Sequence, residues 1–378
     1  MRDILQIING YCGNKVYRNL VTILDSLGIR QWVYIPIRSL KDQSLFRNFE
    51  LKNTVYCYSH IIKSLSDRLF FFRKIRKINR DIERNENFSP GMLIHAHTLF
   101  SDGGVALSLH RKHKMEYLVA VRNTDVNFFY KYFFFLRGYG EMILLEAKQV
   151  IFLSPGYQET VLKKYVKAVN REKIERKSRV IPNGIDPFWQ DHIFQRNHVN
   201  PQNIRLLYVG EIRRNKNLHT TIKAVGIMRE HGWNVRLWVV GYGLNDEQGY
   251  AAVIRKLCDS LPYVDAIDQV HDHGALMQYY RGSDIFIMPS FTETFGLVYA
   301  EAMSQGLPLI YSKGQGIDGY FGDGEAGYAI DPRDPEDIAV KVQEILQHYL
   351  KLSNFCSSQA GQFSWERIGA IYKSLYET

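Results

Sequence analysis

The chain has 378 residues, of which 46% are hydrophobic and 23% are charged, a composition that excludes a disordered or low-complexity protein. Its four cysteines are far apart and form no Cys-x-x-Cys pair, which excludes a disulfide scaffold or a cysteine zinc site and favours a reducing compartment. Residues 1–187 carry 31 Lys and Arg against 17 Asp and Glu, a net +14, whereas residues 188–378 carry 17 against 22, a net −5. This asymmetry indicates that the first half faces something anionic.

The N-terminal residues do not form a signal peptide, because Asn9, Gly10 and Asn14 interrupt a short apolar stretch. No window of about 18 residues is apolar and uncharged, as a membrane-spanning helix requires. We therefore expect a cytoplasmic protein that contacts a membrane only peripherally, if at all.

In the first half, short and almost continuously apolar runs alternate with helical patterns. Strands are predicted at 4–8, 32–37, 92–96, 117–121, 150–153 and 179–181, and helices at 14–27 and 155–169. Runs that are apolar on both faces are typical of strands in a parallel sheet that helices cover on both sides.

The second half repeats this alternation. Strands are predicted at 204–210, 235–240, 284–288 and 307–311, and helices at 217–231, 246–259, 296–305 and 335–350. The pattern predicts an α/β protein of two doubly wound domains, residues 1–185 and 186–362. The breakers in PNGIDP (182–187) mark the boundary, and the C-terminal helix, 363–378, is expected to pack back onto the first domain.

The segment MPSFTETFGLVYAEAMSQGLPLIY (288–311) is the most informative in the chain. A buried strand is followed by a loop with Glu293 and by a helix that begins near Gly296 and carries Glu301. Open α/β sheets bind ligands where strands end, and free amides at a helix start favour a phosphate. By themselves, two glutamates at this spacing would as readily be solvated surface residues.

This segment resembles the donor site of family 4 retaining glycosyltransferases, which have the GT-B fold of two facing Rossmann-like domains with a cleft between them. VIPNGID (180–186) and LLYVGEIRRNKNL (206–218) are similar to further segments of that family. WVVGYG (238–243), LIHAH (93–97) and the closing helix also match in the expected order. Members of this kind assemble bacterial cell-surface polysaccharides.

The resemblance implies that Glu293 binds hydroxyls of the donor sugar and that Glu301 binds the nucleotide ribose. Lys216 would pair with the donor diphosphate, with no metal ion, since the chain has no Asp-x-Asp motif. Backbone amides that would hold a phosphate belong to Phe295, Gly296 and Leu297. Gly210 and Gly241 would line the donor site. The family commonly has Arg directly after the glycine at 210, whereas this chain has Glu211, so either Arg213 or Arg214 would supply a second cation.

In the first domain, Gly13-Asn14 after the first strand is either a turn that admits a donor phosphate or a plain strand-to-helix turn. His95 and His97 are expected on opposite faces of their strand, with His97 facing the cleft as a catalytic residue. Arg122-Asn123 stands where the family usually has His-Gly, so Arg122 would be catalytic, and Asn123 and Asp125 would bind the acceptor.

Three further segments have less specific interpretations. GQGIDG (314–319) predicts a mobile loop over the donor rather than a dinucleotide fingerprint, and HDH (271–273) predicts a solvated loop rather than a metal site. Basic and aromatic residues are interleaved at 64–80 and 128–137. They indicate either an amphipathic helix that packs on the core and exposes its basic face to solvent, or peripheral contact with an anionic membrane.

The resemblance implies transfer of a sugar from a UDP- or GDP-linked donor to a glycan or lipid-linked acceptor, with retention of anomeric configuration. No separate cofactor and no nucleic acid are expected. A catalytically silent glycosyltransferase-like subunit and a GT-B sugar-nucleotide epimerase are the alternatives. Turnover of the donor by the isolated protein would discriminate among them.

Overall fold

The structure is a computed structural model that describes residues 2–12, 14–39, 50–62, 70–241 and 249–377. Contacts divide the chain into two units. Unit 1 comprises residues 1–153, 157–184 and 365–378, and unit 2 comprises 154–156 and 185–364. The division after Gly184 lies one residue from the predicted domain boundary.

Unit 1 contains a parallel sheet of seven strands in the order β3-β2-β1-β4-β5-β6-β7. The strands are β1 (Ile4–Ile7), β2 (Gln31–Pro36), β3 (Thr54–Ser59), β4 (Leu93–Ala96), β5 (Tyr117–Val121), β6 (Gln149–Phe152) and β7 (Ser178–Val180). All predicted strands of this half are confirmed, and β3 was missed. Its side chains are mostly only half-buried, because it lies at the sheet edge, so the apolar signal is weak.

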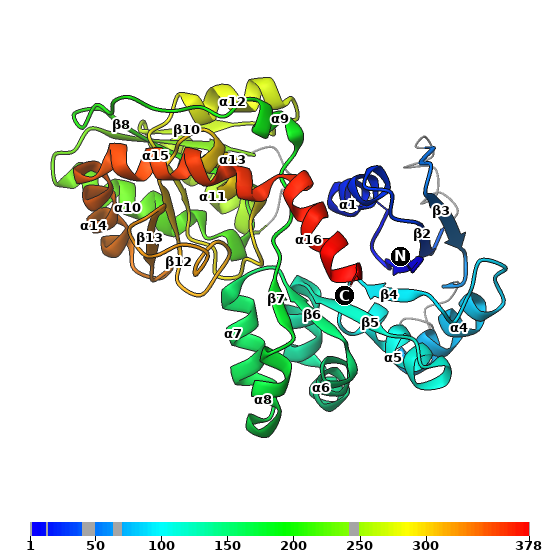
Figure 1. Ribbon diagram of the computed structural model, residues 1–378. Coiled ribbons are helices and arrows are strands. Elements are labelled where there is room, and N and C mark those ends of the chain that lie inside the picture. Colours follow the sequence, from blue (N-terminus) through cyan, green and yellow to red (C-terminus); the bar gives the residue numbers. More distant parts are fainter. Residues whose placement is uncertain (1, 13, 40–49, 63–69, 242–248, 378) are drawn as a thin grey trace. The chain divides into compact units, whose positions relative to one another are not determined.

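Helices cover both faces of this sheet (Figure 1). They are α1 (Lys15–Ser26), α4 (Phe71–Glu83), α5 (Ser101–His113), η1 (Asp125–Tyr130), η2 (Phe134–Leu136), α6 (Arg137–Glu146), α7 (Pro155–Lys164), α8 (Ala168–Glu175) and α16 (Trp365–Glu377). On one face, Ile368 and Tyr372 of α16 share a core with Leu24 of α1 and Ile4 of β1. On the other, α4, α5 and α6 bury their apolar sides. The last helix thus completes the core of a domain whose sequence begins more than 300 residues earlier.

Unit 2 contains a parallel sheet of six strands in the order β10-β9-β8-β11-β12-β13. The strands are β8 (Ile204–Val209), β9 (Val235–Val240), β10 (Val264–Ile267), β11 (Ile285–Met288), β12 (Leu309–Ser312) and β13 (Gly327–Ile330). The helical elements are α9 (Pro187–Asp191), η3 (Arg214–Lys216), α10 (Leu218–Glu230), α11 (Tyr250–Ser260), α12 (His273–Arg281), α13 (Leu297–Ser304), α14 (Pro335–Gln347), α15 (Tyr349–Gln359) and η4 (Ala360–Phe363). The predicted strands are confirmed, whereas the edge strands β10 and β13 were missed.

Both sheets place β1 or β8 in the interior, with the chain crossing to strands on either side. This reversal of strand order creates a switch point where loops at the carboxyl ends diverge, the place where open α/β sheets bind ligands. In unit 2 the switch point lies between β8 and β11, which are hydrogen-bonded neighbours. The loops after these two strands carry Lys216 and Glu293.

Candidate functional site

The loop between β11 and α13 carries Glu293 and ends at Gly296, directly before the first helical residue, Leu297. Gly296 has φ +77°, and a Cβ there would lie 2.6 Å from the Tyr299 ring and 3.2 Å from the Glu293 side chain. Only glycine fits this turn. The first amides of a helix have no acceptor within it, so the backbone of Phe295, Gly296 and Leu297 presents donors of the kind that bind phosphate.

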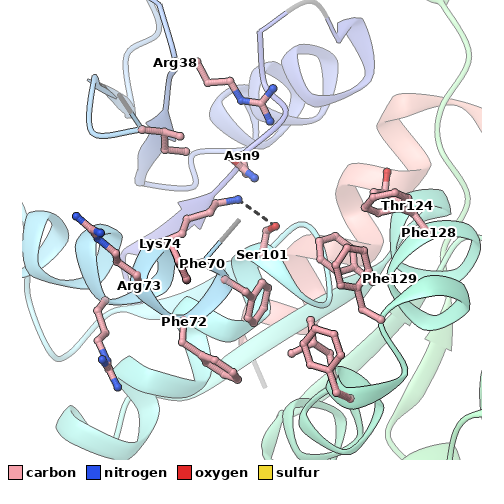
Figure 2. Close-up of a pocket in the computed structure, with 16 residues that line it drawn as sticks. Asn9, Arg38, Phe70, Phe72, Arg73, Lys74, Ser101, Thr124, Phe128 and Phe129 are labelled. Atoms are coloured by element: carbon pink, nitrogen blue, oxygen red, sulfur yellow. Dashed lines mark hydrogen bonds between the residues drawn. The ribbon is translucent and has the colours of Figure 1, made fainter. Parts of the chain in front are cut away.

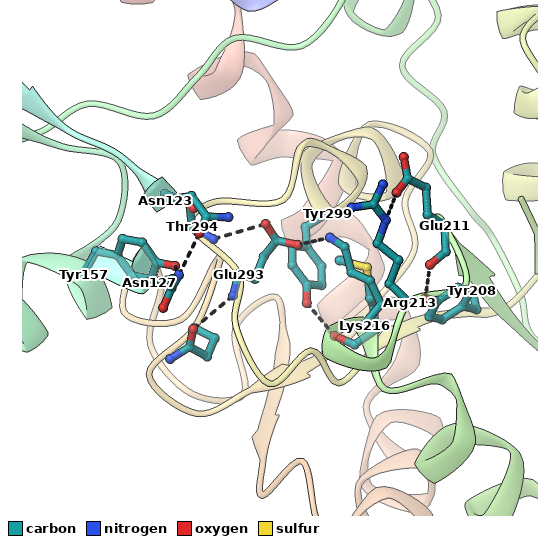
Figure 3. A network of polar contacts seen from close by, with 12 residues as sticks. Asn123, Asn127, Tyr157, Tyr208, Glu211, Arg213, Lys216, Glu293, Thr294 and Tyr299 are labelled. Atoms are coloured by element: carbon teal, nitrogen blue, oxygen red, sulfur yellow. Dashed lines mark hydrogen bonds and ion pairs between the residues drawn. The ribbon is translucent and has the colours of Figure 1, made fainter. Parts of the chain in front are cut away.

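Lys216 and Glu293 form the central ion pair of unit 2. Lys216 closes the short η3 helix after β8, and its Nζ donates to Glu293 Oε2. Figure 3 shows the two side chains pointing toward one another from different loops. Glu293 is only 8% exposed, so the pair is shielded from water on most sides. The structure thus brings two predicted site residues, 77 positions apart in sequence, into direct contact.

The segment after β12 braces this loop. Gln315 Oε1 accepts from the backbone amide of Glu293 at 3.0 Å, and the Gly316 amide donates to the Glu293 carbonyl at 2.8 Å. Gly316 has φ +60°, and a Cβ there would lie 2.9 Å from Tyr299. The predicted mobile loop is therefore bonded on both sides of Glu293, and it holds the backbone around that carboxylate.

Asn217, which the sequence interpretation passed over, locks the Lys216 turn. It adopts φ +59°, and its amide donates to the carbonyls of Pro289, at 2.8 Å, and Pro332. Its side-chain oxygen accepts from Thr220 at 2.7 Å. Asparagine tolerates the left-handed conformation, so an Asn as the first residue of a predicted helix was the available signal.

Gly210 and Gly241 end the neighbouring strands β8 and β9. The Gly210 amide donates to the Val240 carbonyl at 3.0 Å, and a Cβ on Gly241 would lie 2.5 Å from the Gly210 oxygen. Gly241 has φ +111°, and only glycine lets the backbone at this position approach the backbone at Gly210 so closely. The remainder of the predicted turn, 242–243, lies outside the described residues.

The two candidate arginines have different surroundings. Arg213 forms an ion pair with Glu211, the residue that replaces the usual family arginine (Figure 3). Arg214 lines a separate surface depression with His219, Tyr250 and Lys256. The charge of Arg213 is therefore partly offset in this structure, and Arg214 faces α11.

Glu301 lies on α13, half-buried, and accepts a hydrogen bond from the Tyr280 hydroxyl at 3.0 Å. Burial raises its pKa to about 7, an effect that the tyrosine bond partly opposes and that Asp186 reinforces. Most of such a shift comes from withdrawing the carboxylate from water. Glu301 is therefore poised to change its charge near neutral pH, and is not the solvated surface residue that its spacing alone would equally allow.

In unit 1, the expectation for the two histidines was wrong. Residues two apart on a strand face the same side, and the rings of His95 and His97 stack with centroids 3.9 Å apart. Both are fully buried, so His97 does not face a solvent-filled space. The Gln6 amide nitrogen donates to Gln31, which leaves the Gln6 oxygen to accept from His97 Nε2 at 2.7 Å.

Burial also controls the charge of this histidine pair. It lowers the pKa of His95 to about 3, with a smaller contribution from Arg122. The pKa of His97 is lowered in the same way, by burial first and then by His95 and Arg122. Both rings are therefore neutral at physiological pH, as interior groups packed against α16 through the Tyr376 hydroxyl, 2.7 Å from His95 Nδ1.

Asp125 was predicted to bind an acceptor, but its buried environment favours a structural role. Its carboxylate is 1% exposed and accepts from the backbone amides of Leu99, Phe100 and Arg122, at 2.9 to 3.1 Å. Burial nevertheless raises its pKa to about 6, against these three bonds. Asp125 therefore ties the loop after β4 to the loop after β5, a structural role.

Arg122 is also largely internal. It is 8% exposed, donates to the His97 carbonyl at 3.2 Å and to Asn183 Oδ1 at 2.9 Å, and lies over the Tyr17 ring. Asn123, by contrast, is exposed and accepts from Asn127 at 2.7 Å. The predicted first-domain set thus separates into a buried network and one accessible residue.

The turn after β1 is described only in part, since Gly13 lies outside the described residues. Asn14 caps α1, with its side-chain oxygen accepting from the Val16 amide at 3.0 Å. This bond is the ordinary N-cap interaction, which accounts for the residue without a ligand.

No group of three or more His, Cys, Asp or Glu side chains within the described ranges could hold a metal ion. In the HDH segment, Asp272 caps α12 through the Ala275 amide, and His273 lies 3.7 Å from Asp186. The part of the chain that the structure describes also contains no helix long and apolar enough to cross a bilayer.

Residues 190–362 match the family model described as glycosyl transferases group 1. A D-inositol 3-phosphate glycosyltransferase from Paenarthrobacter aurescens is 27% identical over 184 residues, covering 47% of this chain and 45% of that protein. An uncharacterized glycosyltransferase from Methanocaldococcus jannaschii is 26% identical over 251 residues, covering 61% of this chain and 60% of that protein. The matched part is thus about half the length of such relatives.

Solved structures share the fold along the whole chain. A sucrose-phosphate synthase from Thermosynechococcus elongatus has TM-score 0.76 at 21% identity, covering 100% of this chain and 98% of its own. HepE from Anabaena, in complex with UDP and glucose, has TM-score 0.70 at 16% identity and full coverage of both chains. The predicted fold class, two Rossmann-like α/β domains of the GT-B type, is confirmed.

Proposed function

Starting from the match of residues 190–362 to the glycosyl transferases group 1 family, we propose that this protein transfers a sugar from a UDP- or GDP-linked donor to a glycan or lipid-linked acceptor. The observation that carries the proposal is the Lys216–Glu293 pair, beside the start of α13 and at the switch point of the unit 2 sheet. The site brings together a cation, a carboxylate and the amides at a helix start. In a nucleotide sugar these groups would bind the diphosphate, the sugar hydroxyls and a phosphate, respectively.

Each donor-site residue has a part in this proposal. Glu293 accepts from hydroxyls of the sugar, and the amides at 295–297 hold the phosphate. Glu301 accepts from both ribose hydroxyls, and Lys216 pairs with the diphosphate, supported by Arg213 or Arg214. Gly210 and Gly241 keep the backbone close, so that side chains do not fill the space a nucleotide would take.

We further propose that the transfer retains anomeric configuration and uses no metal ion. In this mechanism the acceptor attacks the face that the diphosphate leaves, and the departing phosphate helps to remove the acceptor proton. The barrier is lowered chiefly by fixed positive groups where negative charge develops on the leaving diphosphate. NMR of the product linkage tests retention, and full activity in excess EDTA tests the metal claim; an inverted anomer or a requirement for Mn²⁺ or Mg²⁺ would overturn them.

The direct test of the proposal is Glu293→Ala, with Glu230→Ala as a matched control at the exposed end of α10. Loss of a buried, charged hydrogen-bonding partner costs about 1–3 kcal/mol, so we expect at least a tenfold loss of transfer for the first and none for the second. A protein with no turnover of any nucleotide sugar would be the silent subunit. Conversion of the donor sugar without an acceptor would identify an epimerase.

Roles in unit 1 are proposed on narrower support. Asn123 is the accessible member of the predicted acceptor set, and the turn at Gly13-Asn14 is proposed to lie against the donor phosphate. His97 and Arg122 would act by shaping the wall behind the acceptor, since both side chains are internal.

We also propose that the enzyme works at the inner face of the cell membrane, in assembly of a cell-surface polysaccharide. The +14 charge of residues 1–187 and the exposed side chains of Tyr132 and Phe134 support this location. Each Lys or Arg near an anionic surface contributes about 1 kcal/mol, so a few suffice for reversible docking. The protein should float with anionic vesicles at low salt and be released at high salt; absence of flotation at low salt would refute the location alone.

A further inference from the structure

Unit 1 contains a groove of about 910 Å³ that the donor-site argument does not use. One wall is the start of α4 with Phe70 before it, and the other is the η1–η2 segment with Phe128 and Phe135. Figure 2 shows phenyl rings from both walls gathered at one end of the groove. The volume lies within the range of sites that hold a small organic ligand.

The aromatic end is unusually accessible. Phe70 is 59% exposed, Phe72 48%, Phe128 47% and Phe135 65%. Monomeric proteins rarely expose several neighbouring large apolar side chains without an interaction partner. Phe129 lies deeper and stacks on the buried Phe100, so the exposed rings are backed by the core rather than by a loose loop.

The opposite end of the groove is polar and cationic. Figure 2 shows Arg38, Asn9 and Lys74 together there, and Lys74 Nζ donates to Ser101 Oγ at 3.2 Å. Arg73 and Arg76 also line the groove, whereas no described Asp or Glu does. The groove therefore joins an apolar floor to a positive end whose described lining contains no acidic side chain.

A buried carboxylate supports this cationic end from behind. Asp102 is 1% exposed; one of its oxygens accepts from the Asn9 amide at 3.3 Å, and the other, Oδ2, is a buried atom with no hydrogen-bond partner. Burial lowers the pKa of Lys74 and raises the pKa of Asp102 to about 7, and the attraction between the two groups partly opposes both shifts. Asp102 thus favours the charged form of the lysine at this place, without a hydrogen bond to it in the described residues.

We propose that this groove binds the lipid phosphate of an amphiphilic acceptor, with the phosphate at Lys74 and Arg38 and the hydrocarbon chain along Phe70, Phe128 and Phe135. The inference rests on the proposed transferase function and names its acceptor class. Charge selects an anionic head, and the aromatic walls select a chain rather than a second sugar. The concave shape places the chain inside the protein, instead of inserting the protein into a bilayer.

The binding test uses octyl, decyl and dodecyl phosphate below their critical micelle concentrations, measured by calorimetry. Each methylene removed from water strengthens binding by up to about fourfold, so we expect affinity to rise along the series. Decanol should bind more weakly than decyl phosphate to the native protein. Equal affinity along the series, or no binding by any of the three, would overturn the proposal.

Two neighbouring phenylalanines provide a matched pair of variants. Phe135 lines the groove, whereas Phe134, 73% exposed, does not. Phe135→Ser should weaken decyl phosphate binding at least tenfold, and Phe134→Ser should leave it unchanged. Equal losses would indicate a membrane-facing patch instead of a groove. Arg38→Ala, an exposed change, should weaken decyl phosphate binding several-fold and decanol binding not at all.

The outcome is separable from that of the proposed function. If the protein transfers sugar but binds no alkyl phosphate, the transferase proposal holds and the groove proposal is wrong. If it binds alkyl phosphates with affinity that rises with chain length but turns over no nucleotide sugar, the groove binds amphiphiles and the transferase proposal is wrong. UDP binding should be the same in the Phe134 and Phe135 variants, which shows that both are folded.

Discussion

Units 1 and 2 share a parallel, doubly wound architecture but hold their polar residues in different ways. In unit 2, Lys216 and Glu293 meet at loop ends, with their backbone held by Asn217 and Gln315. In unit 1, the polar residues near strand ends are enclosed in the core: His97 bonds to Gln6, and Arg122 and Asp125 bond to backbone groups. The comparison teaches that a position at a strand end does not by itself make a polar residue a site candidate, because packing can enclose it in the core.

The largest effect that we expect is on catalysis, and it tests the role of the Lys216–Glu293 pair in unit 2. Lys216→Met removes the cation of the donor-site pair, and we expect transfer to fall about a hundredfold, comparable to removing one preorganised donor from a developing anion. Lys223→Met, the same change at an exposed position of α10, should have no effect. Steady-state transfer rates measure both; equal rates for the two variants would break the comparison.

The next effect is on stability and lies in unit 1. Asp125→Ala leaves three buried amides without their acceptor, so we expect the free energy of unfolding to fall by about 2 kcal/mol. Asn123→Ala, two positions away and exposed, should change it by less than about 0.5 kcal/mol. Urea denaturation compares the two, and UDP affinity in native buffer should be the same in both. A specific loss of acceptor binding with unchanged stability would restore Asp125 as a ligand-binding residue.

A smaller effect concerns pH. Burial raises the pKa of Glu301 to about 7, so the carboxylate fraction grows as pH rises from 6 to 8. Two ribose hydroxyls donate better to the ionised group, and nucleotide-sugar affinity should increase by up to about tenfold over this range. Glu301→Gln should bind more weakly with a flat profile. A nucleotide sugar is the appropriate probe, because its diphosphate does not titrate there; an unchanged slope in the variant would assign the effect elsewhere.

Folding stability should respond to Glu301 in the opposite direction. A carboxyl whose folded pKa lies above its unfolded value keeps its proton in the native protein while the unfolded chain has released it. Its contribution therefore favours the native state most below the unfolded pKa and is lost as pH rises through about 7. Binding and stability thus change with opposite signs at this one residue.

The sequence by itself determined the fold class, the interior strands of both sheets, and the loop with Glu293 that ends at Gly296 before a helix. These features depend on residues that are close in sequence: the spacing of apolar residues, of Gly and Pro breakers and of glycines. Interior strands are also buried on both faces, so their sequences are almost continuously apolar and easy to identify. The edge strands β3, β10 and β13 were missed because partial burial weakens the apolar signal, although the edge strand β7 was predicted. The match of motif order along the chain supplied the family resemblance.

Only the tertiary structure decided which polar residues are accessible. His97 and Asp125 have the residue types of a site, yet partners 25 or more positions away enclose them. The same is true of the contacts that make the candidate sites: Lys216 meets Glu293 across 77 positions, and Lys74 meets Ser101 across 27. Whether a polar group meets water or a partner depends on packing between distant segments, and desolvation then determines its charge, which no local pattern encodes.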